Sequence, residues 1–192
     1  MKAILTGALA LLLAGSAIAQ ERAFAIGHAR PGMRLSEFRY SPHGAGNKVI
    51  CSNDAQRPPG TSALDLPKIM TKAELNRCSV FSEKAGFWQQ AEVPLAGAAA
   101  EFWLMAIKDD SGTERVAQIY ARQPRPAYEK TLALLSDKLG PPAESRPGAA
   151  RWKSAATEAS AAHDGYEVKI FLAEPRLQAL MQSRLDAAAK KK

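Results

Sequence analysis

The alternation of apolar and polar residues predicts a sheet whose centre is one long hairpin. Residues 101–108 (EFWLMAIK) are too uniformly apolar for a surface strand, and residues 109–112 (DDSG) have the composition of a turn. The chain then returns through residues 115–120 (RVAQIY), so we expect these two segments to be the central strands. Shorter strand patterns occur at residues 48–51, 78–81, 87–93, 151–153 and 166–172.

Three segments have the periodicity of helices. The first, residues 32–40, is short. The second begins near Pro126 and ends at Gly140, and it has apolar residues three or four positions apart at Tyr128, Leu132, Leu135 and Leu139. The third follows Pro175 and is amphipathic, and we expect it to fray into a flexible basic tail at residues 187–192. At least one face of the second helix must therefore pack on the sheet.

Two segments interrupt the strand patterns. Residues 53–77 form an excursion between two strands, and Thr71 and Glu74 have the spacing of a capping box, which predicts one or two helical turns there. Residues 154–165 are small and polar, which predicts a loop.

The order of these elements predicts an α+β fold in which an antiparallel sheet carries its helices on one face. Consecutive strands joined by hairpin-length turns cannot be parallel. An amphipathic helix buries its one apolar stripe against another element, and here that element is the sheet. The same order fits two tandem units, each a helix followed by a meander of strands. We expect residues 20–192 to form a single domain.

The first residues have the pattern of a secretory signal peptide. Lys2 is followed by the apolar run 3–14, and Ala17-Ile18-Ala19 has the small-x-small pattern of a cleavage site. The alternative is an uncleaved signal anchor, although the apolar run is short for a membrane span. We therefore predict cleavage near Ala19, a periplasmic or secreted location, and no transmembrane segment in the mature chain.

Export makes the two cysteines informative. Disulfides persist outside the cytoplasm, so Cys51 and Cys78 are expected to pair with each other and to close the excursion at residues 51–78. A metal site or a reactive thiol would need further ligands or a C-x-x-C spacing, and the sequence has neither.

Composition and charge exclude several classes of protein. The 192 residues are 46% hydrophobic and 23% charged, which fits an ordinary globular domain and excludes a collagen-like or disordered chain. Removing residues 1–19 takes away one lysine and no acidic residue, so the net charge falls from +7 to +6. Half of that charge belongs to the lysines at 190–192. We therefore expect no nucleic-acid partner.

No motif in the chain predicts catalysis, a cofactor or a metal. The histidines are His28, His43 and His163, each in a segment with an edge or loop pattern. His163-Asp164 is the one local His/Asp pair, and it fits a solvated turn better than a catalytic dyad. Glu37 could act as an acid or base, but an exposed helix position explains it as well. We therefore predict no catalytic residues, cofactor or metal ligands.

The residues considered for binding are basic and aromatic. Arg30, Arg34 and Arg39 could line one anion-binding surface around the first helix, whereas a solvated helix face is the simpler interpretation. Tryptophans are expected in the core or at its edge, and an exposed one would mark a partner surface; they are Trp88, Trp103 and Trp152.

Two short patches resemble a known family. Gly32-Met33 followed by Glu37-Phe38-Arg39 resembles the opening helix of the small outer-membrane assembly lipoproteins, the SmpA/OmlA or BamE-like family. Leu135, Leu139, Gly140 and Pro141 resemble the helix end of the same proteins. The repeated helix-then-meander order is similar to the β-lactamase-inhibitor-protein-like fold. The resemblance implies an envelope location and a binding role, and it implies no catalytic residues.

These observations lead to two functional hypotheses. The first is a non-enzymatic periplasmic module that binds an envelope protein or an anionic envelope component, as an inhibitor or an assembly accessory. The alternative is a small envelope hydrolase acting on cell-wall or lipid material through His163 or Glu37. A cleft that gathers both residues would favour the hydrolase, whereas an exposed flat or concave sheet would favour binding.

Overall fold

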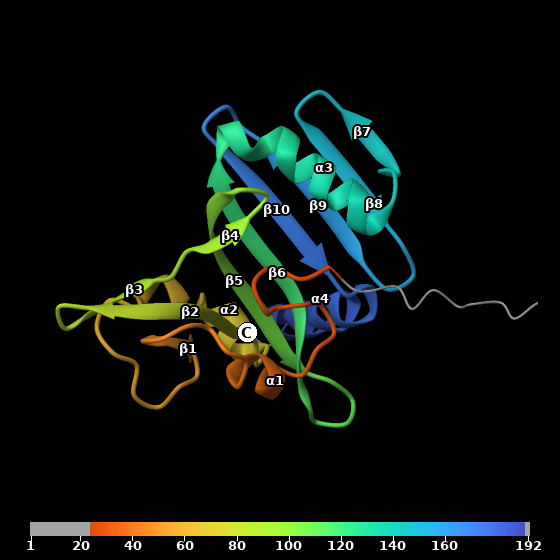
Figure 1. Ribbon diagram of the computed structural model, residues 1–192. Helices are drawn as coiled ribbons and strands as arrows, with labels where there is room; N and C mark the ends of the chain where they lie inside the picture. The colour runs from red at the N-terminus through yellow and green to blue at the C-terminus, as the bar shows by residue number, and fades with distance from the viewer. Residues whose placement is uncertain (1–23, 191–192) are drawn as a thin grey trace, which may run out of the picture.

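The fold is dominated by one antiparallel sheet. The computed structural model describes residues 24–190, and within them a ten-stranded sheet runs in the order β1-β2-β5-β6-β10-β9-β8-β7, with β3 paired to β2 and β4 paired to β5 (Figure 1). The predicted signal peptide lies outside the described residues. The strands are β1 (Asn47–Cys51), β2 (Asn76–Lys84), β3 (Phe87–Gln90), β4 (Val93–Leu95), β5 (Ala98–Lys108), β6 (Glu114–Pro124), β7 (Glu144–Arg146), β8 (Ala149–Lys153), β9 (Glu158–His163) and β10 (Glu167–Ala173).

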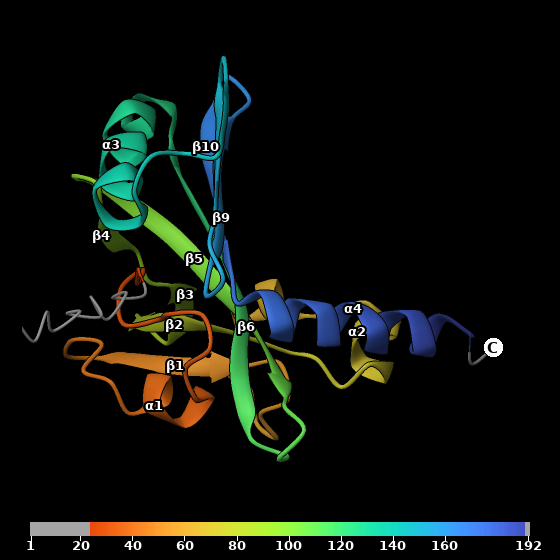
Figure 2. The same ribbon diagram turned by 90° about the vertical axis from the view of Figure 1, so that its right-hand side faces the viewer.

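The helices lie on both sides of this sheet. They are α1 (Leu35–Arg39), α2 (Lys68–Lys72), α3 (Tyr128–Leu139) and α4 (Pro175–Lys190), with single 3-10 turns at Ser62–Leu64 and Arg125–Ala127. Figure 2 shows α1 and α3 on one side of the sheet and α2 and α4 on the other. We call these sides the α3 face and the α4 face.

The predicted fold class, α+β with the helices on one face of the sheet, is therefore wrong. The reason lies in β5, where four consecutive residues are buried: Leu104, Met105, Ala106 and Ile107. Alternate residues of a strand point to opposite faces, so Leu104 joins the core beneath α3 while Met105 joins the core beneath α4. Since both faces of the central strand are apolar, both must be covered. Nor do two tandem units form separate layers, because β6 pairs with β10 from Gln118 to Pro124 and joins all the strands into one sheet.

The central hairpin is confirmed, but two local predictions are wrong. β5 and β6 occupy the middle of the strand order, as expected. The loop predicted at residues 154–165 contains β9, whose Ala159 and Ala161 are buried in the core beneath α3. Small side chains there allow the helix to approach the sheet, a tertiary effect that local composition does not show. The capping box is also absent, because α2 ends at Lys72 and Glu74 has a left-handed φ of 56° just beyond it.

The predicted pairing of Cys51 and Cys78 is present. The two residues are directly opposite each other on β1 and β2, with their Cα atoms 4.0 Å apart, and their sulfur atoms are bonded. The excursion between them is further fixed by Leu64, which packs in a small cluster with Ile50 and Phe81 on the α4 face. The disulfide thus fastens the base of a segment that also has contacts of its own.

Gly60 is the point where this excursion approaches β3 most closely. Its φ is 91°, and a Cβ at this position would overlap the carbonyl oxygen of Trp88. We expect Gly60→Ala to lower the free energy of unfolding by about 2 kcal/mol, because it adds both a clash and backbone strain. Gly112→Ala is the matched control, since Gly112 also has a positive φ of 79° but has no atom within 4 Å of its Cβ position. Urea unfolding measures both, and equal losses would contradict the predicted clash.

The last helix extends into the segment predicted as a basic tail. α4 continues to Lys190, and Ala188 in its last turn is buried in the core cluster on the α4 face that includes Met105 and Ile107 of β5, with Met70 of α2 packed against it. In Figure 2 this helix projects away from the sheet with α2 beside it. None of the helices in residues 24–190 has the length and apolar character needed to cross a membrane.

Candidate functional site

Two of the three arginines considered for an anion site are paired with carboxylates. Arg30 lies 3.4 Å from Glu37, and Arg39 donates a 2.7 Å hydrogen bond to Asp54. Arg34 is exposed at the start of α1, where its backbone forms an isolated bridge with Arg115. These pairs leave less free positive charge around α1, and a common anion-binding surface there stays a prediction.

The two residues of the hydrolase hypothesis are far apart in the fold. Glu37 is on α1, and His163 is the last residue of β9. The turn between β9 and β10 and helix α1 lie at opposite ends of the molecule in both views (Figures 1 and 2). His163 packs edge-on against Tyr128 with ring centroids 4.6 Å apart. Its position is thus a packing position beside α3.

The tryptophans divide between core and surface. Trp152 is 2% exposed, and its indole N–H donates a 3.0 Å hydrogen bond to the Gly140 carbonyl. Trp88 and Trp103 are half-buried on the α4 face, where Lys48 and Arg122 lie over their rings. The predicted core or core-edge position therefore holds for Trp152 and for Trp88, which packs against the cluster of Leu64. Trp103 belongs to a surface that sequence reasoning did not identify.

That surface is a row of aromatic side chains across the centre of the sheet. Trp103 on β5 is opposite Tyr120 on β6, and Tyr120 is opposite Phe171 on β10. The Trp103 and Tyr120 rings are 4.6 Å apart between centroids, and all three side chains are half-buried. Figure 2 shows no helix over β9 and β10 on this side, because α4 turns away from the sheet. We call Trp103, Tyr120 and Phe171 the aromatic face.

Ion pairs surround the aromatic face. Arg122 donates hydrogen bonds of 2.6 and 2.8 Å to Glu101, and this interaction raises the pKa of the guanidinium. Lys169 lies 2.7 Å from Asp164, whose pKa is lowered by that hydrogen bond. Burial raises the pKa of Tyr120 and so keeps its phenol neutral at physiological pH. The charges thus largely neutralise one another around an uncharged aromatic centre.

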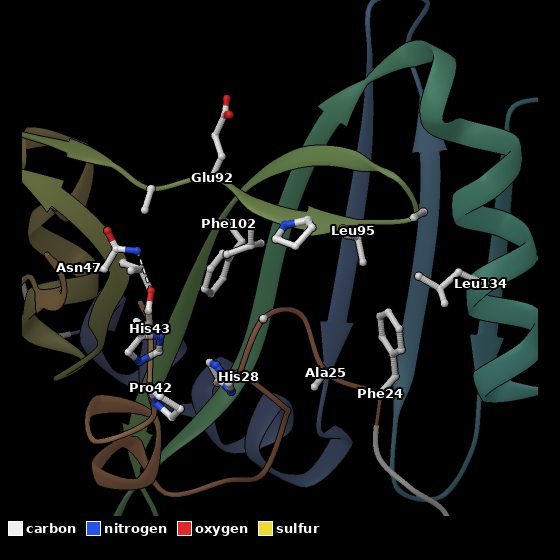
Figure 3. Close-up of a pocket in the computed structure, with 16 residues that line it drawn as sticks. Phe24, Ala25, His28, Pro42, His43, Asn47, Glu92, Leu95, Phe102 and Leu134 are labelled. Carbon is white, nitrogen blue, oxygen red and sulfur yellow. Dashed lines mark hydrogen bonds between the residues drawn. The ribbon is translucent and has the colours of Figure 1, made fainter. Parts of the chain in front are cut away.

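A second feature is a cleft beneath β4 on the α3 face. It has a volume of about 500 Å³ and is mostly apolar. Figure 3 shows His28, His43 and Asn47 at one end, Phe102 in the middle, and Leu95, Leu134 and Phe24 at the other end. Sequence reasoning placed His28 and His43 in unrelated loops, but the fold brings their rings to 5.4 Å between centroids.

His43 is held by a well-defined hydrogen bond. Its Nε2 lies 2.6 Å from the carbonyl oxygen of Phe38, so this nitrogen must carry a hydrogen and donate it. The Asn47 amide donates a 2.6 Å hydrogen bond to the His43 carbonyl. Burial lowers the pKa of His43 from its ordinary value of 6.5, and the neighbouring His28 lowers it further, although the bond to Phe38 opposes the shift.

This lowered pKa predicts a dependence of stability on pH. The unfolded chain takes up a proton at His43 at a higher pH than the folded chain does, so stability is lost as the pH falls below about 6.5. We expect His43→Gln to reduce the loss of unfolding free energy between pH 7.5 and pH 5.5. His163→Gln, which changes a histidine with no such bond to the Phe38 carbonyl, is the control. Urea unfolding at both pH values measures the effect, and identical losses in the wild type and His43→Gln would contradict it.

The described residues offer no metal centre. Among residues 24–190 there is no group of three or more His, Cys, Asp or Glu side chains placed to hold a metal ion. The candidate sites are therefore the aromatic face and the cleft beneath β4.

Comparisons with protein-family models, with curated proteins and with solved structures find no match to this chain.

Proposed function

We propose that this protein is a non-enzymatic binding module that recognises a protein of the cell envelope through the aromatic face. The observation that carries the proposal is the alignment of Trp103, Tyr120 and Phe171 across three neighbouring strands, half-buried on a face of the sheet that the helices leave bare over β9 and β10. The Tyr120 and Phe171 rings lie among charged side chains, because Arg122 and Lys169 are two positions away on the same strands. The rings supply apolar contact area that a partner can bury.

The composition of the face fits a protein partner. The centre of a protein interface is enriched in Trp, Tyr and Arg, and a polar rim surrounds it. Here Arg122 lies over the Trp103 ring at 5.9 Å while it remains bound to Glu101. A partner with apolar side chains at the centre of its own contact surface could cover the row without leaving this arginine unpaired.

Envelope location rests on two further observations. The pattern of residues 1–19 is that of a secretory signal, and the disulfide between Cys51 and Cys78 is of a kind that persists outside the cytoplasm. An inhibitor or an assembly accessory is the role that these features support together. Glu37 and His163 lie at opposite ends of the molecule, which argues against a hydrolase site that uses both residues.

The experiment is affinity capture from periplasm, followed by measurement of the dissociation constant with the captured protein. We expect Trp103→Ala and Tyr120→Ala each to weaken binding at least about thirtyfold, because central aromatic residues contribute about 2 kcal/mol or more to such interfaces. Phe87→Ala is the matched control, since Phe87 is 67% exposed on β3 and lies outside the aromatic face. Equal capture by the wild type and both aromatic variants would overturn the proposal.

A further inference from the structure

The cleft beneath β4 is on the opposite side of the sheet from the aromatic face, so it requires a separate explanation. Phe102, at the centre of the cleft, belongs to the core beneath α3, whereas its neighbour Trp103 points to the other side. We propose that this cleft binds a single-chain amphiphile, with its apolar chain between Phe24, Leu95 and Leu134 and its anionic head group at His28 and His43.

The apolar end of the cleft is held in place before any ligand binds. Leu95 on β4 is 6% exposed, and its carbonyl oxygen accepts a hydrogen bond from the amide of Gln123 on β6. Gln123 in turn accepts a 2.9 Å hydrogen bond from Thr131 on α3. The β4 wall is thus tied to both the sheet and the helix through buried groups. A preformed apolar wall of this kind lowers the entropic cost of binding an alkyl chain.

The polar end of the cleft can recognise an anion. The His43 Nε2–H is already donated to the Phe38 carbonyl, so the neutral ring has only the lone pair of Nδ1 left to offer. When His43 takes up a proton, Nδ1 becomes a second donor and the ring becomes positive. The ring of His28 lies 5.4 Å away, so an anion beside His43 is within reach of both imidazoles. An anion bound there stabilises the charged form of His43.

The one other ionisable side chain in the lining is Glu92, and it does not neutralise this end of the cleft. It is exposed, and Figure 3 shows its carboxylate directed away from the cavity. Asn47 is uncharged and is bound to the His43 carbonyl. Binding of an anionic head group is therefore expected to strengthen as the pH falls and the His43 imidazole becomes charged.

Decanoate, decyl phosphate and 1-decanol test this proposal, with isothermal titration of the disulfide-bonded protein at pH 5.5 and pH 7.5. We expect decanoate or decyl phosphate to bind about tenfold more tightly at pH 5.5, which is within the contribution of one charge-assisted hydrogen bond. Tighter binding of decanoate indicates a free fatty acid as the source of the ligand, and tighter binding of decyl phosphate indicates a phospholipid fragment. Binding of 1-decanol as tight as that of both anions at pH 5.5 would overturn the proposal.

Variants locate the two ends of the ligand. We expect His28→Asn with His43→Asn to abolish the difference between the two pH values, and Leu134→Glu to weaken binding at both. His163→Asn is the control, because His163 packs against Tyr128 outside the cleft.

The chain has three histidines, so NMR can follow each ring in the unmutated protein. Decanoate should shift the His28 and His43 signals and leave that of His163 in place, and a shift of none of them at pH 5.5 would overturn the proposal. Trp103→Ala should leave this binding unchanged, which separates it from the function proposed for the aromatic face.

Discussion

Replacing Cys51 and Cys78 together by alanine is expected to lower the free energy of unfolding by about 3.5 kcal/mol. The bond closes a loop with a sequence separation of 27, and without it the unfolded chain gains the conformations that the closed loop forbids. Both sulfur atoms are fully buried between β1 and β2, so the substitution also leaves small cavities in the core. Urea unfolding of the oxidised protein and of the double variant measures the difference.

Chemical reduction supplies the control for this prediction. Unmutated protein in reducing buffer should be about as unstable as the double variant, because both lack the bond and keep the same fold. The excursion retains contacts of its own, among them the hydrogen bonds from Arg77 to the carbonyl oxygens of Ala63 and Asp65. A loss below about 1 kcal/mol in both cases would show that these contacts, and not the disulfide, hold residues 52–77 to the sheet.

The elements that sequence reasoning located are those in which local chemistry and burial agree. The hairpin of β5 and β6 has an uninterrupted apolar run on one side of a clear turn, and α3 has both a periodic face and a glycine stop. Tyr128 and Leu135 on that face are buried, as predicted. The disulfide followed from the number of cysteines and the predicted export alone.

The elements that sequence reasoning missed depend on partners distant in the chain. β9 consists of alanines and polar residues, and it is a strand because β8 and β10 pair with it on both sides. The fold class was wrong because the distribution of helices between two faces depends on which face of the central strand each one covers. The apolar run of residues 104–107 contained that information, since four consecutive buried positions require cover on both sides.

The candidate sites were missed for the same reason. A signal for part of the aromatic face does exist in the sequence, because Phe171 alternates with the charged residues Glu167 and Lys169. The alignment of the three rings into one row is set by the pairing of β5, β6 and β10, which no local pattern specifies. The proximity of His28 to His43 likewise depends on two loops that meet only in the folded chain.

Leu104→Ala is expected to have the other large effect on stability, about 3 kcal/mol. Leu104 is fully buried in β5, where it is opposite Ile119 on one neighbouring strand and Cys78 on the other. Truncation removes apolar burial and leaves a cavity at a place where the paired strands hold the backbone and limit collapse. Urea unfolding measures the loss, and an unchanged m-value would show that the denatured state is the same.

Trp103, which precedes Leu104 on β5, supplies a variant whose comparison with Leu104→Ala tests both the fold and the proposed function. Trp103 points to the opposite face of the same strand, where it contacts Tyr120 and Arg122 and remains half-exposed. We expect Trp103→Ala to cost about 1 kcal/mol of stability, because it removes surface contacts and creates no cavity. Leu104→Ala should therefore unfold more easily yet bind the partner normally while folded, whereas Trp103→Ala should stay folded and lose binding. If Trp103→Ala were as destabilising as Leu104→Ala, the aromatic face would belong to the core and could not be a docking surface.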